Sequence, residues 1–154
     1  MSGSISRLIY ISSNRIRGDD ASVRMAIDSI LDSARIANAQ ADITGALMFN
    51  KGRFAQILEG RRVDIEETFE RIQYDDRHSD VVILSFEKVV ARSFSFWSMG
   101  YVGENQQMSE VFDSIRNTSG FVASDIPAER IFTLLRESLI EAESNAYETD
   151  RRTA

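Results

Sequence analysis

Three polar side chains in apolar surroundings are the strongest candidates for chemistry in this sequence. Gln56 alternates with Phe54 and Leu58 in a strand-like run, so its amide shares a strand face with two large apolar groups. Tyr10 lies in the middle of a short apolar strand, and Asn38 falls near the buried side of a predicted helix. Buried amides and phenols need hydrogen-bond partners. The three side chains therefore either satisfy backbone groups, the commoner case for each alone, or together line a polar cavity for a ligand.

Periodicity predicts the elements that position these side chains. They are a strand at 8–12, a helix at 23–41 capped near Asp19 to Ser22, a hairpin of strands 43–49 and 53–59 ended by Gly60, a helix at 63–73, and strands at 81–89 and 94–102. In strand 81–89 one face is expected to carry Val81, Ile83 and Ser85, and the other Val82, Leu84 and Phe86. The order βαββαββ predicts an α+β, ferredoxin-like mixed sheet with two helices on one face.

Two C-terminal helices are predicted to cover the other face of the sheet. Their apolar stripes are Met108, Val111, Phe112 and Ile115 in one, and Ile131, Leu134, Leu135, Leu139 and Ala142 in the other. The predicted organisation is one domain over residues 5–103, a helical extension over 104–147 as an output or oligomer surface, and a disordered tail over 148–154. The stripe of Phe132, Leu135 and Leu139 can pack on the domain's own sheet, on another subunit or on a partner.

Composition excludes several classes of function. The 154 residues contain no cysteine and one histidine, so disulfides, thiolate sites and clusters of several histidines cannot form within the chain. A net charge of −6 argues against a general nucleic-acid binder, and no apolar run is long enough to span a membrane. No metal site is expected. The paired carboxylates Asp19-Asp20 and Asp75-Asp76 are typical of helix caps or solvated turns. We expect a cytoplasmic protein whose partners are small molecules or proteins.

Five separated segments carry a family pattern. They are Arg7-Leu8-Ile9-Tyr10-Ile11-Ser12; Asn38 followed by Ile43-Thr44-Gly45; the run G-x-F-x-Q-x-L-E-G from Gly52 to Gly60; Asp76-Arg77-His78; and Trp97-Ser98-Met99. From about Arg7 to Val102 the chain resembles the BLUF domain, the blue-light sensor that uses FAD. The resemblance implies a short photoreceptor with a flavin held noncovalently between the two helices. The expected cofactor is FAD, which FMN or riboflavin can replace in recombinant material.

The resemblance also implies roles for individual residues. Tyr10 is the electron and proton donor to the excited flavin, and Gln56 bridges Tyr10 to the flavin N5 and C4 carbonyl region. After light, Gln56 is left rotated or tautomerised, and its new hydrogen bond to the C4 carbonyl shifts the absorption to the red. Asn38 matches the residue at the C4 carbonyl and N3 edge, and Arg77 the one on the C2 carbonyl side. An amide suits a hydrogen-bond switch because it carries both a donor and an acceptor.

Four further residues are candidates with weaker grounds. Ile43 is expected to contact the cofactor, and His78 is either a ribityl contact or a structural histidine. Trp97 and Met99, two residues apart, are expected on one face of the last strand, either as core side chains or as the signal relay that the family implies. The sequence leaves open which of the two faces the flavin.

The expected output is a signal to another protein and not an enzymatic activity. About fifty residues follow Val102, too few for an effector domain with its own core, so we expect action in trans. A cyclic-di-GMP phosphodiesterase or a transcriptional regulator is the expected partner, together with a homodimer or larger homo-oligomer. The alternative function is an acylphosphatase-like hydrolase on the same fold, in which Arg15 or Arg17 holds phosphate. The missing glycine-rich phosphate cradle argues against it. A flavin-free interaction module is the third interpretation.

Overall fold

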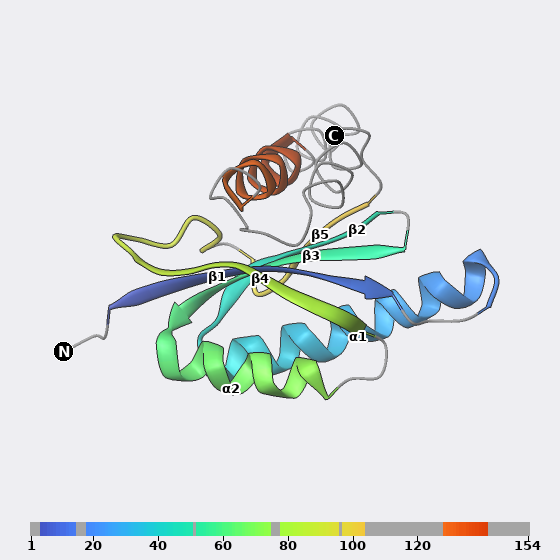
Figure 1. Ribbon diagram of the computed structural model, residues 1–154, viewed down its shortest axis with the longest axis horizontal. Helices are drawn as coiled ribbons and strands as arrows, with labels where there is room; N and C mark the ends of the chain where they lie inside the picture. The colour runs from blue at the N-terminus through green and yellow to red at the C-terminus, as the bar shows by residue number, and fades with distance from the viewer. Residues whose placement is uncertain are drawn as a thin grey trace, which may run out of the picture.

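The fold is a five-stranded sheet with helices on both faces (Figure 1). The computed structural model describes residues 4–14, 18–50, 52–74, 78–95, 97–103 and 128–141. Its elements are β1 (Ile5–Asn14), α1 (Asp20–Ala41), β2 (Thr44–Asn50), β3 (Arg53–Arg61), α2 (Arg62–Gln73), β4 (His78–Val89) and β5 (Gly100–Val102). Residues 128–141 are also helical. The predicted order βαββαββ is confirmed.

The sheet has the strand order β4-β1-β3-β2-β5, so β1 and β3 lie near its centre. The pairs β1–β4, β1–β3 and β2–β3 are antiparallel, whereas β2 and β5 are parallel, which makes the sheet mixed as predicted. Tyr10 in β1 lies directly opposite Gln56 in β3. Directly opposed residues of an antiparallel pair point to the same face, so the register brings these two polar side chains together.

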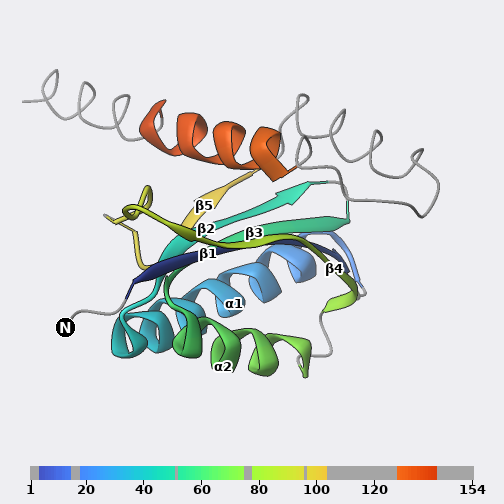
Figure 2. The same ribbon diagram turned by 60° about the vertical axis from the view of Figure 1, so that its left-hand side comes forward.

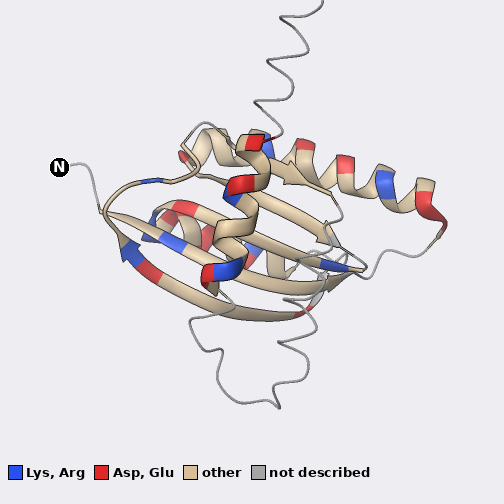
Figure 3. Ribbon diagram, turned by 90° about the horizontal axis from the view of Figure 1, so that it is seen from above, with Lys and Arg blue, Asp and Glu red and all other residues tan. Residues whose placement is uncertain are grey.

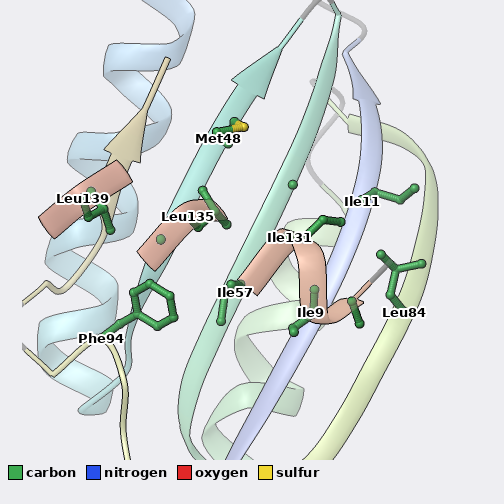
Figure 4. Packing of buried hydrophobic residues seen from close by; sticks show 12 residues of the cluster. Ile9, Ile11, Met48, Ile57, Leu84, Phe94, Ile131, Leu135 and Leu139 are labelled. Carbon is green, nitrogen blue, oxygen red and sulfur yellow. The ribbon is translucent and has the colours of Figure 1, made fainter. Parts of the chain in front are cut away.

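The two faces of the sheet have separate apolar cores. Helices α1 and α2 both lie under one face, and helix 128–141 crosses the other (Figures 1 and 2). The first core includes Leu8, Tyr10, Leu31, Phe54, Leu58, Ile65 and Met99. The second includes Ile9, Ile11, Met48, Ile57, Leu84, Phe94, Ile131, Leu135 and Leu139 (Figure 4). The predicted apolar stripe of the last helix therefore packs on the protein's own sheet.

The ends of α1 follow from local chemistry. Asp19 is the N-cap, and its side chain accepts a hydrogen bond of 2.9 Å from the backbone N–H of Ser22. This bond lowers the pKa of the Asp19 carboxyl. The predicted cap is thereby confirmed. At the other end, Asp42 adopts the left-handed conformation with φ 55°, where helices usually place glycine.

Two sequence-based predictions about strands are wrong. Residues 94, 95 and 97–99 are not part of the last strand, because β5 covers only Gly100–Val102. Turn hydrogen bonds bend the preceding segment instead, since Trp97 N–H donates to the carbonyl of Phe94 at 3.1 Å and the Trp97 carbonyl accepts from Gly45 N–H at 3.0 Å. Gly60 does not end the hairpin strand either, because β3 continues to Arg61 opposite Ile5 of β1.

The predicted alternation along β4 is wrong beyond Leu84. Adjacent residues of β1 pair with Ser85 and Ile83, so Leu84 is an extra residue in the strand. Leu84 is buried in the core under helix 128–141. Val81 and Phe86, predicted on opposite faces, both pack against the core under α1 and α2. The bulge therefore reverses the predicted alternation from Ser85 onward.

Several predictions fall on residues outside the described ranges. They concern the helix around Met108 to Ile115, the Asp75-Asp76 pair, Arg77, and the alternative's Arg15 and Arg17. The tail at 148–154 and most of the connection from 104 to 127 lie outside as well. Acidic and basic residues interleave along the described part of helix 128–141 and on the strands beneath it (Figure 3). Such a mixed surface favours protein or small-molecule partners over nucleic acid.

Gly45 is a point of close backbone approach between β2 and β3. A Cβ atom at this position would lie 1.9 Å from the carbonyl oxygen of Ile57. We expect Gly45→Ala to cost about 3 kcal/mol of unfolding free energy and to lower Tm by about 9 °C, measured by circular dichroism on heating. Gly103→Ala is the matched control, since nothing lies within 4 Å of a Cβ there. Equal Tm values for the two variants would contradict the close approach.

Candidate functional site

The site begins with a hydrogen-bonded pair at the centre of the sheet. Tyr10 and Gln56 are 0% and 5% exposed on the face covered by α1 and α2. The Tyr10 hydroxyl donates a hydrogen bond to Gln56 Oε1. The Tyr10 ring packs edge-on against Phe69 of α2, with centroids 5.0 Å apart. The sequence prediction that both polar side chains are buried on one strand face is confirmed.

The amide nitrogen of Gln56 has a weaker contact than its oxygen. Nε2 lies 3.7 Å from Sδ of Met99, and a thioether sulfur is a poor hydrogen-bond acceptor. Among the described residues no stronger acceptor faces this nitrogen. The amide is therefore held firmly at one end by a phenol and loosely at the other. A half-turn of this side chain would exchange its donor and acceptor with little loss at the Met99 end.

Asn38 anchors the segment before β5 to α1. Its side chain is buried, and Nδ2 donates a hydrogen bond of 2.7 Å to the carbonyl of Ser98. One turn earlier in α1, Arg35 Nε donates to the carbonyl of Met99 at 3.0 Å. Asn38 is buried on α1, which covers the sheet face of Tyr10 and Gln56, but the structure gives no hydrogen bond between Asn38 and either of them. The Nδ2 group of Asn38 thus satisfies a backbone carbonyl, which is the commoner role expected from the sequence for a buried amide.

Trp97 and Met99 lie on opposite sides of the sheet, so the prediction that they share a strand face is wrong. Met99 is 2% exposed in the core that contains Tyr10, and it contacts Gln56. Trp97 is half-buried and packs against the other core, with its ring 6.2 Å from that of Phe94. The turns between residues 94 and 99 cause this separation, because the period of two holds only in extended strands. The structure thus places Met99, and not Trp97, beside Gln56.

The remaining predicted contacts are described only in part. Ile43 is 1% exposed, and its backbone N–H donates to the carbonyl of Asn38 at 2.8 Å, which places it between α1 and β2. His78 is the first residue of β4 and lies opposite Asn14. Arg77 precedes it outside the described residues.

Sequence reasoning missed a buried ionic cluster behind the site. The Glu59 carboxylate is 0% exposed and forms a salt bridge of 2.7 Å with Arg7, the residue directly opposite it on β1. Arg92 donates hydrogen bonds to Thr44 Oγ1 and to the carbonyls of Glu59 and Asp42. A carboxylate in an apolar strand run was the available signal, because a buried charge needs a partner.

Comparison with known proteins identifies the class. A family model described as "Sensors of blue-light using FAD", BLUF, matches residues 5–100. The blue light- and temperature-regulated antirepressor BluF of Escherichia coli K12 is 36% identical over 90 residues, which are 58% of this chain and 21% of the relative. Photoactivated adenylate cyclase subunit beta of Euglena longa is 34% identical over 71 residues, 46% of this chain and 8% of that protein.

Solved structures agree with the sequence comparison. The dark-state structure of BlrB, a BLUF protein, has a TM-score of 0.73 at 27% identity and covers 90% of this chain and 100% of its own. The photo-activated state of BlsA gives a TM-score of 0.70 at 29% identity, with 88% and 95% covered. Klebsiella pneumoniae BlrP1 in a manganese and cyclic di-GMP complex gives 0.61 at 27%, with 86% and 33% covered.

The chain therefore belongs to the BLUF family of blue-light sensors, whose chromophore is flavin. It spans about a fifth of the length of the Escherichia coli relative and less than a tenth of the Euglena one. None of the described helices is both long enough and apolar enough to cross a bilayer. No group of metal-ligating side chains occurs within the described ranges.

The described side chains fit a flavin chemically. The edge of the flavin ring alternates acceptors and a donor at N5, the C4 carbonyl and N3–H. Two primary amides are buried, Asn38 on α1 and Gln56 on the sheet face that α1 and α2 cover, and an amide supplies both a donor and an acceptor. The apolar side chains around them suit the ring faces.

Proposed function

We propose that this chain holds FAD noncovalently between α1 and α2 and that Tyr10 and Gln56 form its photochemical pair. The observation that carries this proposal is the buried Tyr10 hydroxyl donating to Gln56 Oε1, while among the described residues the amide nitrogen meets only the Met99 sulfur. Asn38, Ile43, Arg77 and His78 are the further residues proposed to contact the cofactor.

The bound flavin supplies absorption of blue light and, once excited, a ring that accepts an electron. Tyr10 is the buried side chain able to give up that electron, and its hydroxyl proton leaves toward Gln56 Oε1 along the existing hydrogen bond. The electron and the proton would then return to Tyr10, leaving Gln56 turned or tautomerised. In that state the Gln56 amide would present its donor toward the C4 carbonyl edge of a bound flavin, the change that is expected to shift the absorption to longer wavelength. Exclusion of water by the surrounding core keeps these hydrogen bonds strong.

The test of this function is the absorption spectrum of the purified protein. We expect a yellow protein in the dark whose bands shift reversibly to longer wavelength under blue light. A colourless protein that hydrolyses acyl phosphates would support the alternative hydrolase. A protein that neither binds flavin nor hydrolyses acyl phosphates would support the simple interaction module.

Asn38 gives a prediction about cofactor affinity. Asn38→Ala removes one buried amide, and a hydrogen bond of this kind contributes about 1.4 kcal/mol, which is about tenfold in affinity. We therefore expect the Kd for FAD to rise about tenfold, measured by quenching of flavin fluorescence on titration into apoprotein. Gln40→Ala, an exposed amide two residues further along α1, is the control and should keep the Kd unchanged. Equal affinities for both variants would remove Asn38 from the cofactor site.

The output is proposed to be a light-dependent contact with a cytoplasmic protein in trans, without enzymatic activity of this chain. A transcriptional regulator or a cyclic-di-GMP phosphodiesterase is proposed as the partner. Support comes from the Escherichia coli antirepressor and from the BlrP1 complex with cyclic di-GMP. We also propose a homodimer or larger homo-oligomer, with the region 104–147 as its surface. Light scattering in darkness and under blue light tests the oligomer, and co-purification with each candidate class tests the partner.

A further inference from the structure

A buried ion pair lies on the sheet face opposite the Tyr10–Gln56 pair. Glu59 is three residues beyond Gln56 on β3, so its side chain points to the other face, toward helix 128–141. Arg7 is directly opposite on β1, and its side chain is 14% exposed. Within the described residues the pair has polar partners on one segment only, the connection between β4 and β5.

This pair holds Ser93 and Phe94 of the connection by three hydrogen bonds, and a fourth joins Arg7 to Glu59. Glu59 Oε1 accepts from the backbone N–H of Ser93 at 2.8 Å and of Phe94 at 2.7 Å. Glu59 Oε2 accepts from Arg7 Nε at 2.7 Å, while Arg7 NH2 donates to Ser93 Oγ at 2.9 Å. Both carboxylate oxygens are thus used, one for the segment and one for the arginine. The guanidinium of Arg7 in turn bridges Glu59 and Ser93.

The connection touches the proposed switch at one end and the last helix at the other. Met99 places its sulfur 3.7 Å from Gln56 Nε2. Phe94 packs edge-on against Phe132 of helix 128–141, with ring centroids 5.6 Å apart. The Arg7 guanidinium also lies over the Phe132 ring, 4.4 Å from its centroid. Movement at Met99 therefore reaches Phe132 through a segment that Glu59 holds by its backbone.

A buried ion pair is a poor choice if stability alone is needed. Apolar side chains of similar size often stabilise a core as well or better, because two charges must lose their water. The Glu59 carboxylate instead provides hydrogen bonds with a defined direction. It orients two consecutive backbone N–H groups, and these determine where the turns at 94–99 place the side chains of Trp97 and Met99.

We propose that Glu59, held by Arg7, is the positioning residue of the Gln56 switch: it keeps Met99 against the amide and couples that contact to Phe132 of helix 128–141. This inference rests on the proposed photochemical function. Return of Gln56 to its dark orientation requires the amide to turn beside Met99. If Glu59 no longer holds the connection between β4 and β5, Met99 moves aside more easily and the Gln56 amide turns back sooner. The light state then decays faster.

The test is Glu59→Gln in the full chain loaded with FAD. Glutamine keeps the size and one oxygen for the two N–H groups but turns an amide nitrogen toward Arg7. We expect flavin binding and the red shift to persist, dark recovery to be at least threefold faster, and acrylamide quenching of Trp97 fluorescence to rise about twofold. Trp97 is the only tryptophan in the sequence, so its emission reports directly on this segment.

The control is Glu66→Gln, which removes the same charge from an exposed ion pair with Arg62 on α2. If Glu59→Gln does not fold, Arg7→Lys decides, because lysine keeps the charge but cannot reach Glu59 and Ser93 together. Recovery within twofold of wild type, or slower, with Trp97 as protected as in Glu66→Gln would overturn the inference. A wild-type protein without any reversible shift would instead refute the proposed function.

Discussion

Replacing Gln56 by leucine leaves a protein that binds flavin and stays yellow but shows no red shift in blue light. Leucine nearly preserves volume in a position that is 5% exposed, so the core under α1 and α2 keeps its packing. The substitution deletes both the acceptor of the Tyr10 hydroxyl and the donor that a turned amide would present. We expect complete loss of the shift, together with a stability cost of about 1 kcal/mol for the lost hydrogen bond.

The measurement is the light-minus-dark absorption difference at equal flavin occupancy. Gln73→Leu, an exposed amide at the end of α2, is the matched control and should retain the full difference spectrum. A normal red shift in Gln56→Leu would show that another group carries the hydrogen-bond change, and the switch assignment would have to be abandoned.

Replacing Tyr10 by phenylalanine removes the proposed electron and proton donor. The ring remains, including its edge-on contact with Phe69, so flavin binding and folding should be retained. Without the hydroxyl, no proton can pass to Gln56 Oε1, and the excited state should decay by fluorescence instead. We expect the red-shifted state to fall below a tenth of its wild-type yield and flavin fluorescence to rise.

Both quantities can be followed in one sample by steady-state fluorescence and by the difference spectrum under blue light. Tyr101→Phe in β5 is the control, because this side chain lies at the sheet edge and is 37% exposed. A stable light state formed in Tyr10→Phe with wild-type yield would remove Tyr10 from the photochemistry.

Local patterns in the sequence were sufficient for the arrangement of the switch pair. Residues two apart in a strand share a face, so Phe54, Gln56 and Leu58 could be placed together, and the structure confirms their common core. The cap at Asp19 and the buried stripe through Ile131 and Leu135 rest on equally local rules.

Contacts between residues far apart in the chain determined the features that local patterns failed to predict. The extra residue at Leu84 arises from the register between β4 and β1, which no property of β4 alone determines. The separation of Met99 from Trp97 depends on turns whose hydrogen bonds come from Glu59 and Gly45. The rule that residues two apart share a face therefore fails between Phe94 and Met99, because hydrogen bonds to distant residues turn the backbone there.

The sequence by itself determined the family, the strand and helix order, and the burial of Tyr10, Asn38 and Gln56, since each depends on residue type and spacing along a few turns or strands. Only the tertiary structure decided that Met99 meets Gln56 and that Glu59 pairs with Arg7, 52 residues away in the chain. The physical reason is that side-chain partners follow from strand register and turn geometry, and these are properties of the assembled sheet.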